Sequence, residues 1–173
     1  MTNKMEKRYP QPFNRRTLYW SLLHLVVFLL LGIGLYYLYE GGYLSAWFTS
    51  VVVALLALMS LSIPRNILLT EQRVEIRCLL DITEIPREEI ASVRRVEPRQ
   101  LKWTFPLFAS CGFFGYYGYY VDLKRWELVK FYASEWGNFV EITDIYEERY
   151  YISTPKADEL VAELTATPPV GEH

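Results

Sequence analysis

The chain has 173 residues, of which 51% are hydrophobic and 22% are charged, and its 18 basic and 20 acidic side chains give a formal net charge of −2. This hydrophobic share predicts a membrane part. After Pro64 the chain carries 13 basic and 18 acidic residues. That balance argues against nucleic-acid binding, which needs Lys and Arg to neutralise phosphates. The two cysteines, Cys78 and Cys111, form no CxxC motif, so the sequence predicts neither a disulfide framework nor a zinc site.

Two runs without charge, residues 17–39 and 41–63, follow a basic segment of residues 1–16. Each run has about the 20 residues that a helix needs to cross ~30 Å of hydrocarbon. We therefore predict a transmembrane helical hairpin over residues 17–64, with spans at 17–39 and 44–63. A signal peptide is the alternative for the first run, but its apolar stretch is too long and a second span follows at once.

The distribution of basic residues predicts the orientation of this hairpin. Five basic residues precede the first span, Arg65 follows the second, and the tip between the spans carries only Glu40. Positive charge collects on the cytoplasmic side of transmembrane helices. We therefore expect an integral protein of the cytoplasmic membrane with residues 1–16 and both termini in the cytoplasm.

Small residues offer a packing surface between the two spans. Small residues repeat along the second span, and two glycines offer small surfaces on the first: Ala46, Ser50, Ala54, Ala57, Gly32 and Gly34. Helices in lipid associate through such surfaces, and we favour packing within the hairpin over a homo-oligomer formed through the same face. His24 is the one titratable residue well inside a span. It has no charged partner in either span, so we favour a neutral, hydrogen-bonded imidazole over a proton relay.

After Pro64 the pattern changes to short β-rich runs. Alternation and β-branched or aromatic content predict about seven strands, at residues 66–70, 73–78, 82–85, 91–96, 126–132, 138–143 and 149–153. Thr154 and Pro155 then begin an amphipathic helix, with Leu160 and Leu164 on its apolar face. We predict a mainly β domain over residues 65–165, a small barrel or orthogonal sandwich with a C-terminal helix against its core. Residues 166–173 form a tail.

An uncharged window, residues 103–121, contains the stretch GFFGYYGYY at residues 112–120. Its length permits a third span, but Pro106 and three glycines make a poor helix, and a third crossing would place the following basic residues outside. We expect an extended loop that becomes a strand near residues 116–121. Some of its aromatics would fill the core and others would rest on the membrane surface or the base of the hairpin.

The residues that we expect at this interface are the aromatics of the stretch and the basic residues just before it. They are Phe113, Phe114, Tyr116, Tyr117, Tyr119, Arg94, Arg95, Arg99 and Lys102. Basic side chains near a membrane surface attract anionic headgroups. The alternative is that the aromatics are all core and that the arginines are solvated.

The segments CGFFGYYGYY, VKFYAS, NFVEI and RYYISTPKADEL follow one another in this order. The order resembles that of the bacterial pleckstrin-homology (PH) family in its membrane-anchored form, over roughly residues 67–165. Two departures stand out: Thr154 lies between Ser153 and Pro155, and no glycine stands at Trp126 or Glu127. The resemblance implies a PH-like fold at the bacterial inner membrane and brings no catalytic residues with it.

The motifs of common enzymes are missing from the sequence. Histidine does not occur in residues 65–172, and no GxSxG, HExxH or GxxxxGK[ST] motif is present. We predict a non-enzymatic module without metal or cofactor, whose partners are the lipid bilayer and a protein. The favoured function is to hold an interaction domain at the cytoplasmic face of the membrane for that protein partner. The alternative is a sensor of lipid headgroups that uses residues 94–102 and the aromatic loop.

Overall fold

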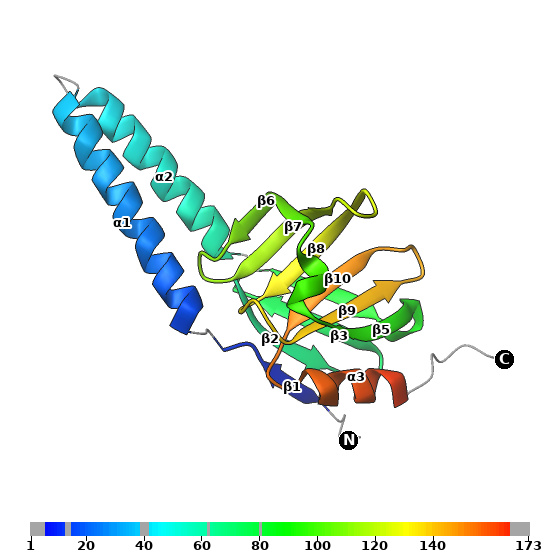
Figure 1. Ribbon diagram of the computed structural model, residues 1–173. Helices are drawn as coiled ribbons and strands as arrows, with labels where there is room; N and C mark the ends of the chain where they lie inside the picture. Colours follow the sequence, from blue (N-terminus) through cyan, green and yellow to red (C-terminus); the bar gives the residue numbers. More distant parts are fainter. Residues whose placement is uncertain (1–5, 13–14, 39–41, 62, 80, 167–173) are drawn as a thin grey trace.

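The structure, a computed structural model, describes residues 6–12, 15–38, 42–61, 63–79 and 81–166. A hairpin of two helices, α1 (Arg15–Leu38) and α2 (Tyr43–Leu61), leans away from a β-rich domain (Figure 1). The expected hairpin tip at Glu40 and most of the tail, residues 167–173, lie outside the described residues.

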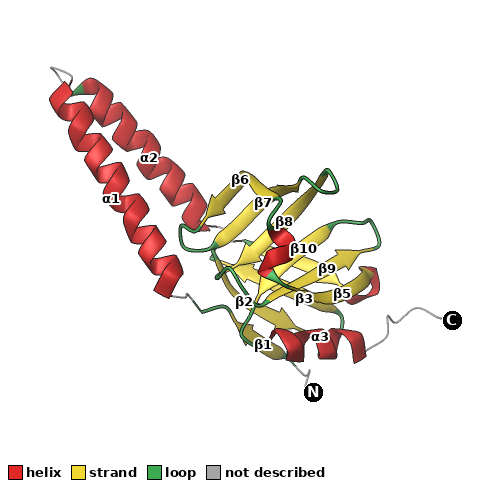
Figure 2. Ribbon diagram, viewed as in Figure 1, coloured by secondary structure: helices red, strands yellow, loops and turns green. Residues whose placement is uncertain are grey.

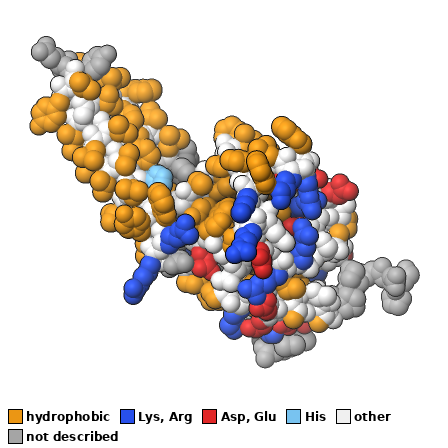
Figure 3. Space-filling view, in the orientation of Figure 1, with side chains coloured by type: hydrophobic (Ala, Val, Ile, Leu, Met, Phe, Trp, Pro, Cys, Tyr) orange, Lys and Arg blue, Asp and Glu red, His pale blue; other side chains and the backbone are white. Residues whose placement is uncertain are grey.

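The two helices pack side by side along their length. By length and composition α1 is able to cross a membrane, and α2 has a shorter apolar part at Tyr43–Ala57. Hydrophobic side chains cover the outside of the hairpin almost continuously (Figure 3). An apolar helix and a helical hairpin are therefore present where the sequence predicted them.

The domain consists of two sheets and a C-terminal helix, α3 (Ala157–Ala166) (Figure 2). Sheet A is antiparallel and has the order β1 (Lys7–Pro10), β2 (Pro64–Leu69), β3 (Arg73–Cys78), β4 (Ile82–Pro86). Sheet B has the order β5 (Ile90–Val96), β9 (Phe139–Asp144), β10 (Arg149–Ser153), β8 (Glu127–Ala133), β7 (Tyr116–Asp122), β6 (Thr104–Cys111). Within sheet B only β10 and β8 are parallel.

The predicted mainly β domain with a C-terminal helix is confirmed, but the number of strands is larger than predicted. Residues 64–153 form nine strands rather than about seven, and β1 adds another. Two of the nine come from the uncharged window, which folds into the hairpin β6–β7 where we expected a loop and one strand. In β6, Pro106 and a register shift between Pro106 and Phe108 break the alternation by which a strand is recognised.

The strand β1 places the N-terminal segment inside the β domain. It pairs antiparallel with β2, from Lys7 opposite Leu69 to Pro10 opposite Asn66, and Tyr9 is fully buried. The helical hairpin is therefore the connection between two hydrogen-bonded neighbours. This strand was not predicted, because its four residues, KRYP, contain two basic side chains and a proline.

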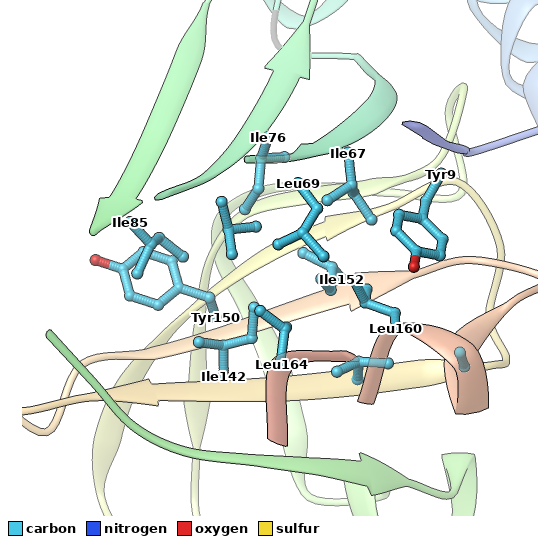
Figure 4. Close-up of a cluster of buried hydrophobic side chains, with 13 residues drawn as sticks. Tyr9, Ile67, Leu69, Ile76, Ile85, Ile142, Tyr150, Ile152, Leu160 and Leu164 are labelled. Carbon is cyan, nitrogen blue, oxygen red and sulfur yellow. The ribbon is translucent and has the colours of Figure 1, made fainter. Parts of the chain in front are cut away.

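The main core lies between the two sheets and α3 (Figure 4). Ile67 and Ile76 point from sheet A toward Ile142 and Ile152 of sheet B, and Leu160 of α3 closes one side. A second cluster lies on the opposite face of sheet B, around Phe131 and Tyr151. Because β5 and β6 are opposite edges of sheet B, the connection between them crosses this face, and its Leu101 covers the second cluster.

Tyr9 tests whether β1 belongs to the folded domain. Replacing Tyr9 by Ala removes an aromatic ring from the main core, and we expect the free energy of unfolding of the full chain in detergent to fall by about 3–5 kcal/mol. Denaturant titration followed by near-ultraviolet circular dichroism measures this change. Arg8→Ala, at the exposed neighbour, should change stability by no more than about 0.5 kcal/mol. Equal stabilities for the two variants would show that β1 is not packed on the domain.

Glu75 of sheet A gives the fold a dependence on pH. Its carboxylate is only 6% exposed because Arg73 and Arg77 cover it, with N–O distances of 2.9 and 2.8 Å. The hydrogen bonds from Arg77 and then Arg73 hold the pKa of Glu75 below its usual value. A carboxyl group with a lowered folded pKa stabilises the fold above its unfolded pKa of about 4.3, and this contribution is lost as pH falls through the folded pKa.

We therefore expect Glu75→Gln to cost about 1–3 kcal/mol at neutral pH and progressively less below about pH 4. Denaturant titrations of the full chain over a pH series measure the difference. Glu88→Gln is a matched control, since Glu88 is exposed and makes no ion pair with another described residue. A Glu75→Gln effect that is the same at every pH would contradict the assignment.

Candidate functional site: the junction of the hairpin with the domain

Two polar side chains at the start of α1 are buried although most of that helix is exposed. Thr17 and Ser21 are each 2% exposed and lie one helical turn apart. The Thr17 hydroxyl donates to the carbonyl of Ser134, just after β8, at 3.0 Å. The Ser21 Oγ accepts a hydrogen bond from the backbone N–H of Phe114 at 2.8 Å. These bonds fix the first two turns of α1 to sheet B.

The turn between β6 and β7 is shaped for this contact. Its backbone closes with a hydrogen bond from the N–H of Gly112 to the carbonyl of Gly115 (3.0 Å), and both glycines have positive φ, 94° and 129°. A Cβ on Gly112 would come within 3.5 Å of Trp20 on α1, and one on Gly115 within 2.7 Å of the carbonyl oxygen of Ala133. Glycine therefore lets the turn fit between the helix and β8.

Gln11 makes a second anchor on the other side of the hairpin entrance. Its side-chain amide nitrogen donates to the carbonyls of Tyr132 (2.8 Å) and Ser153 (2.9 Å), at the ends of β8 and β10. Its backbone N–H donates to the carbonyl of Arg65, which extends the pairing of β1 with β2. Gln11 is 4% exposed. Nothing in the sequence pointed to this residue, because a glutamine between two prolines reads as a loop.

The predicted aromatic candidates divide between the junction, the core and the surface. Phe113 is buried and Phe114 half-buried at the junction, and their rings pack edge to face with centroids 4.8 Å apart. Tyr117 is buried, and Tyr116 packs on Trp136. Among the five candidates, Tyr119 is the one with a large exposed area (44%). Phe113 and Phe114 lie in a turn, with φ of Phe114 at 50°. Their side chains therefore do not alternate from one face to the other as neighbouring side chains of an extended strand would.

The predicted basic candidates are partly neutralised. Arg94 binds the buried carboxylate of Glu141 through two hydrogen bonds of 3.1 and 2.9 Å, and Arg95 pairs with Asp158 of α3. Arg99 and Lys102 are exposed on the connection between β5 and β6. Two further basic residues that the sequence did not single out, Lys124 and Arg125, lie near this connection. They line a polar hollow of about 180 Å³ together with Arg94 and Glu141.

The predicted packing residues of the hairpin lie in two different environments. Gly32 faces α2, where the Ser45 hydroxyl donates to its carbonyl at 2.8 Å, whereas a Cβ on Gly34 would meet no atom within 4 Å. The small residues of α2 are all exposed: Ala46, Ser50, Ala54 and Ala57. The half-buried positions of α2 are instead Ser45, Phe48, Val52 and Leu56. His24, half-buried, contacts the carbonyl of Trp20 one turn earlier through its Nδ1 at 2.7 Å.

The two cysteine thiols of the domain are both shifted away from ionisation. Burial raises the pKa of the Cys78 thiol to about 12 and also raises the pKa of Cys111, so neither thiol ionises appreciably at neutral pH. Within the described part of the chain, no three His, Cys, Asp or Glu side chains gather as a metal site would require. What the arrangement does provide is a set of buried hydrogen bonds that joins a helix to a sheet.

Comparison with known proteins agrees with this architecture. A family model described as a bacterial PH domain matches residues 65–167, more than half of the chain. The match runs from β2 to α3 and confirms the resemblance found in the sequence. No curated protein and no solved structure matches the chain.

Removing the Ser21 hydroxyl tests the junction. Ser21→Ala removes the hydroxyl that accepts the hydrogen bond from the half-buried N–H of Phe114, and the loss of such a bond costs about 1–3 kcal/mol. We expect hydrogen exchange of the Phe114 amide, measured by NMR on the full chain in detergent, to accelerate by about 5- to 150-fold. Leu22→Ala, at an exposed neighbour, should leave this amide unchanged. An unchanged rate in Ser21→Ala would show that the turn is not held by α1.

Proposed function

Because the chain belongs to the bacterial PH-domain family, we propose that it is a non-enzymatic, membrane-tethered interaction module. In this proposal α1 and α2 both cross the cytoplasmic membrane. The PH-like domain is held at the cytoplasmic face and binds a protein partner there. The family supports a module for protein or lipid interaction, and the junction described above supports the finer assignment.

The dimensions and surface of the hairpin support the membrane crossing. α1 has 24 residues, or about 36 Å of helix, and the 19 residues of α2 give about 28 Å. Both lengths suit a hydrocarbon core of about 30 Å with modest tilt. The exposed side chains of α1 between Leu18 and Leu38 are almost all apolar. Arg15 and Arg16 at its start and Arg65 after α2 favour the cytoplasm for this end.

The single observation that carries the proposal is the attachment of α1 to the domain through buried hydrogen bonds. Both ends of the hairpin continue into paired strands of sheet A, and Thr17 and Ser21 fix α1 to sheet B. A flexible linker would be enough to keep a domain near a membrane. A fixed attachment also sets which surface faces the cytoplasm. In Figure 1 the elements farthest from the hairpin tip are α3 and β5, and we propose this side as the one offered to a protein partner.

A second candidate function is recognition of lipid headgroups. It is favoured by the four basic residues near the polar hollow that form no ion pair with other described residues: Arg99, Lys102, Lys124 and Arg125. Arg94 and Arg95, by contrast, are already paired with carboxylates. Lipid contact of this kind is compatible with partner binding at α3, because no described residue of α3 lines the polar hollow.

The topology is tested by cysteine labelling in intact cells. In a Cys111→Ser background, where the remaining Cys78 is buried, Glu6→Cys and Thr165→Cys should react with an impermeant maleimide only after the cells are opened. Gly41→Cys should react from outside. Labelling of Thr165→Cys in intact cells would overturn the proposed orientation.

The two candidate functions are separated by photo-crosslinking in native membranes. A photoreactive amino acid at the exposed Ala162 of α3 should give a discrete protein adduct, and one at Lys102 should not. Lipid adducts at Lys102 with no protein adduct at Ala162 would favour headgroup recognition instead. Ala162 and Lys102 are both exposed, so each serves as the control for the other.

A further inference from the structure

A corner of sheet B carries large apolar side chains that nothing in the domain covers. On the face that packs against sheet A elsewhere, two cross-strand rows are largely exposed: Phe105, the half-buried Val121 and Leu128 in one, and Phe108 and Tyr119, which continue to Lys130, in the other. Cross-strand partners share a face, so the five hydrophobic side chains form one surface, named here the β6 face. Phe108 is 79% exposed, and Leu107, at the bulge beside it, is exposed as well.

The β6–β7 hairpin that carries this face stands against the helical hairpin. Ala109, Cys111 and Phe113 line a cavity of about 290 Å³ whose other wall is formed by His24, Phe28, Val52, Leu55 and Leu56. His24 follows Arg16 by eight residues, which is about 12 Å along the helix axis. The headgroup region on one side of a bilayer is only about 5–8 Å thick. The hairpin β6–β7 therefore reaches the level on α1 at which the headgroups of the cytoplasmic leaflet would meet the acyl chains.

The edge of β6 is poorly suited to pairing with another strand. Pro106 has no N–H to donate, and the register shift between Pro106 and Phe108 interrupts the ladder. An added strand from a partner or a second copy would meet an irregular edge. The β6 face is also continuous with the apolar exterior of the helical hairpin: in Figure 3 hydrophobic side chains gather over β6, beside the hairpin, with Lys and Arg on the domain below them.

The rim of the face has the composition of a membrane interface. In the turn between β7 and β8, Trp126 is 82% exposed and follows Lys124 and Arg125 directly. Trp103 is exposed next to Lys102 at the start of β6. Trp is enriched where hydrocarbon meets headgroups, and Lys and Arg are attracted to anionic lipid at the same level. The apolar side chains would suit the acyl-chain boundary, the tryptophans the interface, and the basic residues the headgroups.

We propose that the β6 face lies in the cytoplasmic leaflet of the membrane, with Phe105, Leu107 and Phe108 at the boundary of headgroups and acyl chains and with Lys124 and Arg125 at the phosphates. The inference rests on the proposed function, since it requires the helical hairpin to span the bilayer. The free backbone groups on the open edge of β6 set the depth. They need water or headgroup oxygens as partners, so the strand stays at the boundary and does not enter the hydrocarbon.

The experiment is spin-label accessibility on the full chain in vesicles of equal parts phosphatidylglycerol and phosphatidylcholine. In a Cys111→Ser background, nitroxide labels are placed at Phe108→Cys, at Leu29→Cys in the middle of α1, and at Tyr146→Cys in the exposed turn between β9 and β10. Oxygen concentrates in lipid and a nickel chelate in water. We expect the ratio of oxygen to nickel collisions at residue 108 to be severalfold above that at residue 146 and below that at residue 29.

Other outcomes would contradict the inference alone or the proposed function with it. If residue 108 behaves like residue 146 while residue 29 is in lipid, the β6 face is in water and the inference fails while the proposed function stands. If residue 29 is itself in water, the hairpin does not span and both fail. If residue 108 is shielded from both reagents and shows spin–spin broadening that disappears on dilution with unlabelled protein, a second copy covers the face and the inference fails.

A charge variant separates the role of anionic lipid from that of the apolar side chains. With Lys124→Glu and Arg125→Glu together, the label at residue 108 should move severalfold toward water in vesicles that contain phosphatidylglycerol. The same variant in pure phosphatidylcholine should move it little. An equal shift in both vesicles would show that the two residues do not meet anionic headgroups and would remove them from the proposal.

Discussion

The pairing of β1 with β2 is the constraint on which the rest of the structure depends. Residues 11–63, a connection of 53 residues, separate these two strands along the chain, yet their backbones are hydrogen-bonded from Lys7 to Pro10. Both ends of the hairpin are thereby held within one sheet, so the helices leave the domain at a fixed place. Closing so long a connection carries an entropic cost of several kcal/mol, and the burial of Tyr9 and Gln11 offsets part of it. A bilayer that already holds the two helices together would lower this cost further.

The polar residues of the junction are explained by the same constraint. Where α1 leaves the domain, backbone carbonyls at the ends of β8 and β10 accept hydrogen bonds from side chains of α1 and of the segment that leads into it. Gln11 and Thr17 donate to three of these carbonyls, those of Tyr132, Ser134 and Ser153. A buried carbonyl without a partner is costly, so an apolar residue at position 11 or 17 would leave the sheet unsatisfied even if it packed well. Positions 11 and 17 therefore require polar side chains, although the helix that follows them is apolar.

Much of the β domain could be predicted from the sequence because its strands face water on one side. In β3 the inward residues Val74, Ile76 and Cys78 alternate with charged ones, and this alternation is the pattern by which strands are recognised. It fails for β1, which is too short, and for β6, whose exposed side chains are apolar and whose proline argues against a strand. The aromatic stretch stands out in the sequence, but its first four residues form a tight turn that depends on contacts with α1 and β8. Sequence spacing does not encode contacts of that kind, and Gln11 was missed for the same reason.

The failure of the β6 prediction is itself informative about the surroundings of that strand. A strand at the edge of a sheet in water normally alternates, or carries charges that prevent association. In β6 neither is found: Phe105, Leu107 and Phe108 are all exposed, and no charged residue lies between Lys102 and Asp122. Sheet A covers the same face of sheet B over β10 and β9, and Tyr117 of β7 is buried there as well, whereas Phe105, Phe108 and Tyr119 are left exposed. The proposed contact of the β6 face with the membrane accounts for both the composition of β6 and the incomplete cover of sheet B, because lipid rather than water would then surround this corner of the domain.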